Sequence, residues 1–159
     1  MHCYFLRHGP AGDAARWEGS DFDRPLTQDG LKRIARQAKT IAAMEVAPDA
    51  IVTSPLVRAR QTAEIVADEL KLRDKVHQDD RVGLGFSAAR LAQILRDYPS
   101  AQSVMLVGHE PSMSLTVGEL IGGGDVDFKK GALACVEISR DEPLAGRLLW
   151  LASPKLLTR

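Results

Sequence analysis

Short apolar runs alternate along the chain with segments in which apolar residues recur at helical spacing. The apolar runs occupy residues 3–6, 50–53 and 103–107. Such runs are typical of strands that are buried on both faces of a parallel sheet. The helical patterns occupy residues 28–42, 55–70, 88–98 and about 111–121. This alternation predicts an α/β fold with a mostly parallel sheet.

Local signals mark where these helices begin and end. Thr27 and Ser87 are each placed to act as an N-cap, and Pro99 ends the third helical pattern. Ser54 and Pro55 predict an N-cap followed by a proline at the first helical position. We therefore expect the second helix to start at residue 55.

Two further apolar runs close the chain, at residues 133–138 and 148–151. The short turn between them predicts an antiparallel pair at one edge of the sheet. The three glycines at 122–124 are interpreted as a flexible joint, because too little chain follows them to form a second core. We expect residues 1–159 to form a single domain.

Composition restricts the function further. The 159 residues are 45% hydrophobic and 26% charged, with 21 basic and 21 acidic residues. This balance gives no general attraction to nucleic acid or to a membrane surface, so any anion site must be local. No signal peptide or transmembrane run is predicted, so we expect a cytoplasmic protein. Cys3 and Cys135 lie inside apolar runs, so we expect both thiols to be buried and, in a reducing cytoplasm, reduced.

Polar residues follow the three apolar runs directly. Arg7 and His8 follow the first, Arg58 lies one turn into the helix after the second, and His109 follows the third. Each of these stretches alone is more typical of solvated residues. The carboxyl ends of parallel strands, however, lie at one edge of the sheet. Taken together, the three stretches therefore predict two arginines and two histidines around one pocket. No carboxylate occurs at residues 7–9, 54–58 or 108–109 to neutralise them, so such a pocket suits a phosphoryl dianion.

The segment 10–26 has no clear period and is interpreted as a loop that drapes over this pocket. We expect Trp17 and Phe22 to pin it to the body of the protein. Arg24, near its end, either reaches the bound anion or is simply solvated.

The motifs that carry these residues resemble those of the histidine phosphatase superfamily, which includes the phosphoglycerate mutases. They are Arg-His-Gly at 7–9, Ser-Pro-Leu-x-Arg-Ala-x-Gln-Thr-Ala at 54–63 and Gly-His-Glu-Pro at 108–111. The short length and the Arg-Pro-Leu-Thr-x-x-Gly segment at 24–30 are similar to the small bacterial phosphohistidine phosphatases of the SixA type. The resemblance implies a phosphoglycerate mutase-like, three-layer α/β/α sandwich around a mostly parallel sheet with an antiparallel edge.

The resemblance also implies a mechanism. His8 attacks phosphorus and carries the phosphoryl group until water releases it, while its other ring nitrogen donates to a backbone carbonyl. Arg7, Arg58 and His109 hold the phosphoryl oxygens, with Arg24 as a further substrate-binding residue. Larger relatives carry an acid in a longer segment after the second motif, where Asp80 is the best positional match here and Asp79, next to it, is the alternative. No metal or cofactor is implied.

A phosphohistidine in a protein, such as a phosphorelay domain, is the favoured substrate. Its leaving imidazole can already be protonated, so the lack of an obvious acid is less damaging than for an alkoxide. The short connections also suggest a pocket that is open to a protein surface. The alternatives are a phosphatase of small molecules such as sugar phosphates or nucleotides, and a non-catalytic phosphate-binding module. A metal site at His8 and His109 would lack a third ligand at suggestive spacing.

Overall fold

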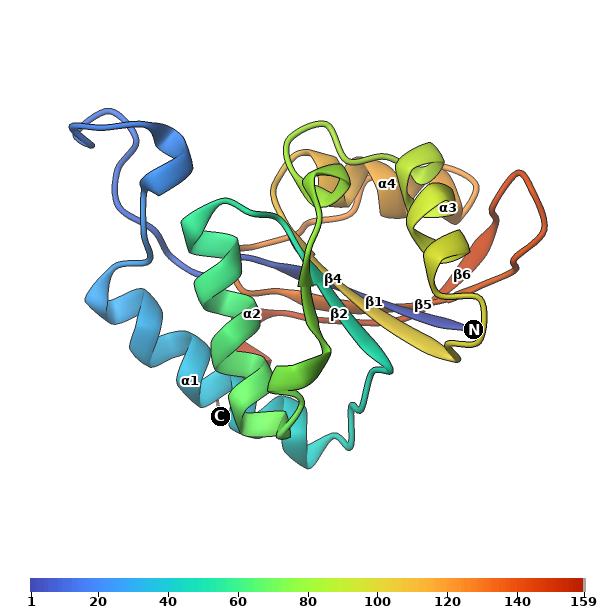
Figure 1. The fold of residues 1–159 in the computed structure, drawn as a ribbon, viewed down its shortest axis with the longest axis horizontal. Helices are drawn as coiled ribbons and strands as arrows, with labels where there is room; N and C mark the ends of the chain where they lie inside the picture. Colours follow the sequence, from blue (N-terminus) through green and yellow to red (C-terminus); the bar gives the residue numbers. More distant parts are fainter. Residues whose placement is uncertain (159) are drawn as a thin grey trace.

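The computed structural model describes residues 1–158 and has a six-stranded sheet at its centre, in the order β3-β2-β4-β1-β5-β6 (Figure 1). The strands are β1 His2–Arg7, β2 Ala50–Thr53, β3 Val76–Gln78, β4 Ser103–Gly108, β5 Leu133–Ile138 and β6 Gly146–Ala152. Strands β3, β2, β4 and β1 are parallel, whereas β5 and β6 run antiparallel to their neighbours. The mostly parallel sheet with an antiparallel edge is thus confirmed.

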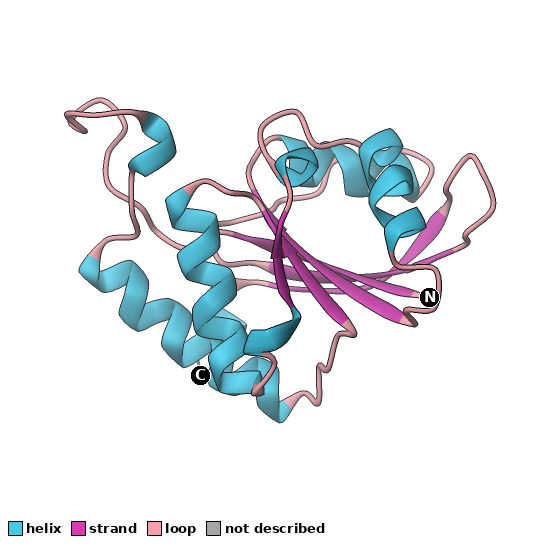
Figure 2. Ribbon diagram, in the orientation of Figure 1, coloured by secondary structure: helices cyan, strands magenta, loops and turns pink. Residues whose placement is uncertain are grey.

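Helices cover both faces of this sheet (Figure 2). They are α1 Gln28–Ala43, α2 Val57–Leu70, α3 Ala88–Asp97, α4 Ser112–Leu120 and α5 Pro154–Leu157. Side chains of α1, α2 and α5 pack in one apolar cluster, and those of α3 and α4 in another. The α/β/α layering is confirmed.

The middle of β1 shows why its sequence is continuously apolar. Successive side chains of a strand point to opposite faces. Phe5 packs in the cluster with α3 and α4, whereas Leu6 packs in the cluster with α1 and α2. Both side chains are fully buried, so neither face of this central strand can accommodate a polar residue at these positions.

Two of the three predicted N-caps are confirmed. The hydroxyl of Thr27 accepts a hydrogen bond from the backbone of Gly30 at 2.9 Å, and Ser87 accepts one from Arg90. The prediction for α2 is wrong by two residues, because the helix starts at Val57 and its N-cap is Leu56. The Ser54 hydroxyl instead lies beside a histidine of the candidate site.

Some elements carry no readable signal. Strand β3 was not predicted, because it is three residues long, lies at the edge of the sheet and leaves two of its side chains exposed. The four-residue helix α5 was also missed.

Cys3 and Cys135 are buried as predicted, and burial raises the pKa of the Cys3 thiol to about 12.

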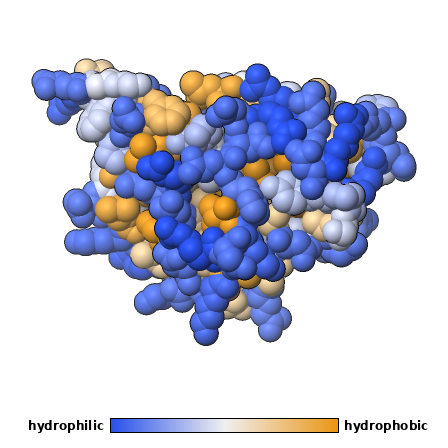
Figure 3. Space-filling model, in the orientation of Figure 1, coloured by the Kyte–Doolittle hydropathy of each residue, from blue (hydrophilic) through white to orange (hydrophobic). Residues whose placement is uncertain are grey.

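In the orientation of Figure 3 the exposed face is mainly hydrophilic, with hydrophobic side chains in small separate spots. None of the helices within residues 1–158 combines the length and the apolar character needed to span a membrane.

Candidate active site

Strands β1, β2 and β4 end at the same edge of the sheet, and a cavity of about 510 Å³ opens there. Five of the six residues predicted for the site line this cavity together. They are Arg7, His8, Arg24, Arg58 and His109. The convergence that the sequence predicted from three separate strand ends is therefore present in the structure.

His8 directly follows β1 and is almost completely buried. Its Nδ1 lies 2.7 Å from the carbonyl oxygen of Gly9, so Nδ1–H donates there and Nε2 keeps its lone pair. Burial, assisted by the positive charges of Arg58 and Arg7, lowers the pKa of His8 from 6.5 to about 3. The imidazole is therefore neutral at physiological pH, with one nitrogen free to act as a nucleophile.

Gly9 allows the chain to pass close to helix α1 at this point. A Cβ atom there would lie 2.5 Å from Cγ1 of Ile34, which is too close for any side chain. The amide of Gly9 donates to the hydroxyl of Thr62 at 3.1 Å, and this hydroxyl donates to the carbonyl of Arg58 at 2.8 Å. One threonine thus connects the loop after His8 to the helix that carries Arg58.

His109 faces His8 across the cavity, with 5.2 Å between the ring centroids. Its Nε2 lies 2.8 Å from the hydroxyl of Ser54, whereas its Nδ1 is buried and has no partner within residues 1–158. Burial first, then the charge of Arg58, lowers the pKa of His109 to about 4. A neutral His109 whose Nε2 accepts from Ser54 has Nδ1–H available as a donor for an oxyanion.

Two guanidinium groups complete the donor set. Nη1 of Arg7 donates to the carbonyl of Phe128 at 2.6 Å, which fixes this side chain at the end of β1. Arg58 is 4% exposed and donates through Nη1 to the carbonyl of Asp21 at 2.8 Å. The Nε atoms of both arginines are buried without partners in the described chain. The site therefore retains hydrogen-bond donors that are not yet satisfied.

Asp21 is a carboxylate that sequence reasoning did not place at the site. Its Oδ2 lies 3.0 Å from Nη2 of Arg58, and its Oδ1 lies 2.9 Å from Nε of Arg24. Hydrogen bonding from Arg24 and the charge of Arg58 lower the pKa of Asp21, so it remains ionised at neutral pH. The sequence predicted only that no carboxylate within the three strand-end stretches neutralises the cations. Asp21 lies outside these stretches and was therefore missed.

The loop 10–26 reaches the cavity but is not held as predicted. Residues 11–14 line the cavity wall, and Arg24 also donates to the carbonyl of Gly12 at 2.6 Å. Trp17 and Phe22 are 39% and 45% exposed, so neither side chain is buried against the body. Asp21 and Arg24 provide the anchor instead, and Figure 1 shows the rest of the loop projecting from the body.

The structure does not place Asp80 in the cavity wall. Its side chain is exposed and makes no hydrogen bond or ion pair within residues 1–158, while neighbouring Asp79 is bound to Arg81. Two carboxylates line the cavity, those of Asp13 and Glu110. Asp13 is paired with Arg16 at 3.7 Å, so Glu110 is the more useful candidate. Its Oε2 accepts from the hydroxyl of Ser114 at 2.5 Å, and its Oε1 is buried without a partner. Its place in the Gly-His-Glu-Pro motif was the available signal.

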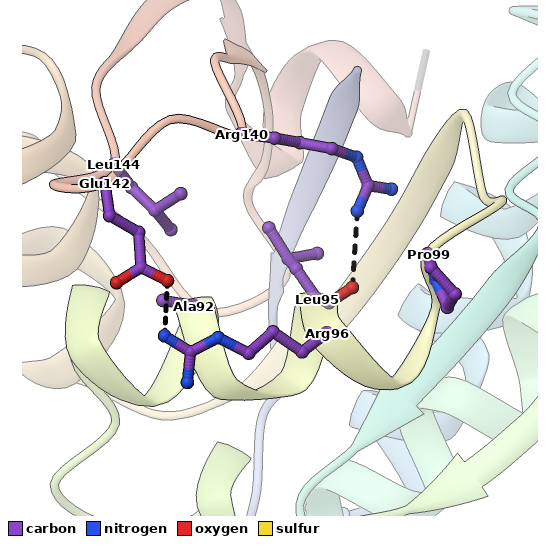
Figure 4. A pocket seen from close by; sticks show the side chains of 7 residues that line it. All are labelled: Ala92, Leu95, Arg96, Pro99, Arg140, Glu142 and Leu144. Atoms are coloured by element: carbon purple, nitrogen blue, oxygen red, sulfur yellow. Dashed lines mark hydrogen bonds and ion pairs between the residues drawn. The ribbon is translucent and has the colours of Figure 1, made fainter.

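A second cavity, of about 370 Å³, lies between α3 and the loop that joins β5 to β6 (Figure 4). Arg96 is paired with Glu142, and Arg140 donates to the carbonyl of Leu95 at 3.3 Å, so both guanidinium groups are occupied. This cavity offers no histidine or other nucleophile. The described residues also contain no cluster of three His, Cys, Asp or Glu side chains placed to hold a metal ion.

Comparison with known families identifies the class of protein. A family model described as the histidine phosphatase superfamily (branch 1) matches residues 3–82. This range contains the nucleophile candidate His8 together with Arg58. The chain belongs to the histidine phosphatase superfamily, and is a phosphatase of that type.

Individual relatives are similar over almost the whole chain. Phosphohistidine phosphatase SixA of Escherichia coli (strain K12) is 30% identical over 159 residues, which cover 97% of this chain and 94% of SixA. A structure of the protein histidine phosphatase SixA complexed with tungstate superposes with a TM-score of 0.87 at 27% identity, covering 99% of both chains. A crystal structure of a SixA-type protein from Agrobacterium tumefaciens superposes with a TM-score of 0.78 at 28% identity, covering 96% of this chain and 98% of that protein.

Proposed function

We propose that this chain hydrolyses phosphohistidine in a protein substrate, through a phosphoryl group carried on Nε2 of His8. The observation that carries the proposal is the state of His8 itself. It is neutral, its Nδ1 is committed to the Gly9 carbonyl, and its free nitrogen belongs to a cavity lined by three arginines.

In the first step, the lone pair of Nε2 attacks phosphorus and an N–P bond forms at His8. The N–P bond to the substrate's imidazole breaks, and its electron pair returns to that nitrogen. The reacting form of the substrate is the one whose other ring nitrogen is protonated, so the ring departs as a neutral imidazole. In the second step, water attacks phosphorus, the His8–phosphorus bond breaks, and inorganic phosphate is released with its oxygens sharing the water's protons.

The donors around the cavity stabilise charge on the transferring group. Arg7 and Arg58 provide planar guanidinium donors, and His109 provides Nδ1–H. Removing a single preorganised donor of this kind typically costs ~10²–10³ in rate. These residues neutralise a phosphoryl dianion by themselves, so we expect turnover to survive treatment with a chelator.

One feature favours phosphohistidine over a phosphate ester: the similarity to SixA extends over nearly the whole chain. A small-molecule phosphatase remains the competing function, and a non-catalytic phosphate-binding module the next.

The test compares turnover of a protein carrying phosphohistidine with turnover of sugar phosphates and nucleotides by the same preparation. We expect phosphohistidine to be preferred, and an alkaline quench to trap acid-labile phosphate on His8. The His8→Ala variant should retain its fold and lose turnover and labelling. Far faster turnover of sugar phosphates would contradict the proposed substrate class. Near wild-type activity of His8→Ala would contradict the assignment of His8 as the nucleophile.

A further inference from the structure

A groove rich in basic side chains leads away from the candidate site. Two adjoining cavities of about 580 and 300 Å³ share most of their lining, including Arg33, Lys130 and Lys155. The larger one reaches Arg7, and Lys130 also lines the catalytic cavity. The groove is therefore continuous with the place where the phosphoryl group is transferred.

The charge of this groove stands out against that of the chain. Besides Arg7, five basic side chains line it, from α1, from the loop before β5 and from α5. They are Arg33, Arg36, Lys129, Lys130 and Lys155. No acidic side chain lines either cavity, although the chain as a whole has 21 acidic and 21 basic residues. This local excess of positive charge creates an attractive field for an anionic partner.

Most of this charge is not neutralised internally. Arg33 pairs with Asp29 at 2.7 Å, and Lys129 with Asp127 at 3.3 Å. Arg36, Lys130 and Lys155 are exposed and form no ion pair within residues 1–158. At the floor of the smaller cavity, Gln37 is 2% exposed and its Oε1 has no hydrogen-bond partner. The groove thus combines free surface cations with an unsatisfied buried amide.

We propose that this groove binds an acidic surface of the protein substrate, next to its phosphohistidine. The inference rests on the proposed function, because it names the surroundings of the same phosphoryl group. The free cations come from three separate segments and are exposed at their ends. This arrangement suits a broad contact with several carboxylates of a partner more than a built pocket for one small anion.

The groove is tested by reversing charge where no catalytic contact is lost. The variant Arg36→Glu/Lys155→Glu changes two unpaired cations of the groove. The matched control Lys32→Glu/Lys39→Glu changes two exposed lysines of α1 that do not line it. Both variants alter the net charge equally, so a general electrostatic effect would appear in both.

The substrates are a phosphorylated histidine-phosphotransfer domain with Asp and Glu around its phosphohistidine, the same domain with those residues changed to Asn and Gln, and free phosphohistidine. We expect the groove variant to lose about tenfold in kcat/KM on the acidic domain, within the range by which charge accelerates association. It should retain wild-type rates on free phosphohistidine. The control should retain both, and 0.5 M salt should reduce the difference.

Three outcomes would contradict a binding role for the groove. They are an equal loss of kcat/KM in the groove variant and the control, an equal loss by the groove variant on free phosphohistidine and on the acidic domain, and undiminished activity of the groove variant on the acidic domain. The proposed function fails in a different way. If the wild-type protein hydrolyses neither free phosphohistidine nor the acidic domain but hydrolyses sugar phosphates, the substrate class is wrong regardless of the groove variants.

Discussion

The carboxylate of Asp21 lies 3.0 Å from Nη2 of Arg58, inside the donor set that a phosphoryl group would use. The backbone carbonyl of the same aspartate accepts from Nη1 of Arg58. Asp21 belongs to the loop 10–26, whereas Arg58 lies in the first turn of α2. A bound dianion and the Asp21 side chain therefore compete for one guanidinium group.

This competition predicts the effect of removing the charge of Asp21. We expect Asp21→Asn to bind inorganic phosphate and tungstate several-fold more tightly than the wild-type protein, because the oxyanion no longer displaces a carboxylate. Isothermal titration calorimetry measures the change. Asp23→Asn is the control, since Asp23 is exposed in the same turn and forms no ion pair in the described chain. Weaker binding by Asp21→Asn would show that Asp21 positions Arg58 instead.

The two buried histidines predict a specific dependence of stability on pH. Their pKa values in the folded protein, about 3 for His8 and about 4 for His109, are below the ordinary 6.5. As pH falls below 6.5 the unfolded chain takes up protons that the folded protein does not, so the stability present above pH 6.5 is progressively lost. Each histidine contributes up to about 1.4 kcal/mol per pH unit until its folded pKa is reached.

Urea denaturation between pH 7 and 5 tests this, because the carboxylates of the chain titrate mostly below that range. We expect the free energy of unfolding to fall toward pH 5, and to fall less steeply in His109→Asn. NMR titration of the His8 ring in the free protein should show no midpoint near pH 6.5. A midpoint at that value would contradict the neutral, buried nucleophile.

Ser54 predicts a further effect, because its hydroxyl is the partner of Nε2 of His109 at 2.8 Å. Without this hydroxyl the ring can adopt the other tautomer, in which Nδ1 no longer donates to an oxyanion. We expect Ser54→Ala to lower kcat about tenfold, less than the ~10²–10³ for a donor that contacts the charge directly. KM should change little. Steady-state kinetics, with thermal unfolding as a check on the fold, measure this.

An equal loss in His109→Ala and in Ser54→Ala/His109→Ala would show that the serine acts through the histidine. Additive losses in the double variant would contradict that role. Ser54→Thr keeps a hydroxyl at the same position and should recover part of the activity.

The sequence predicted the parts of this molecule that depend on local pattern. The apolar run before Arg7 identified the central strand, and the rule that parallel strands end at one edge brought His8 and His109 together. The features that it missed depend on tertiary contacts. The local sequence predicts that Ser54 caps a helix, but its hydroxyl contacts His109. It predicts that Asp21 is a loop residue, but its carboxylate contacts Arg58.

The final prediction concerns the proton donor and compares two carboxylates, Glu110 and Asp80. Glu110 lines the cavity with one buried oxygen that has no partner in the described chain, whereas Asp80 is exposed outside the cavity wall. A general acid contributes typically ~10²–10⁴ where the leaving group must be protonated. A phosphohistidine depends less on such an acid, since its leaving ring departs as a neutral imidazole when its other nitrogen is protonated.

We therefore expect Glu110→Gln to slow hydrolysis of alkyl phosphates by about 10²-fold, with only a few-fold effect on phosphohistidine. Asp80→Asn should leave both rates close to those of the wild-type protein. The glutamine keeps an acceptor for the Ser114 hydroxyl, so the comparison isolates the proton rather than the local packing. A selective loss of alkyl phosphate turnover in Asp80→Asn, with Glu110→Gln unaffected, would assign the acid to Asp80. Equal losses on both substrates in Glu110→Gln would show that Glu110 supports the site without transferring a proton.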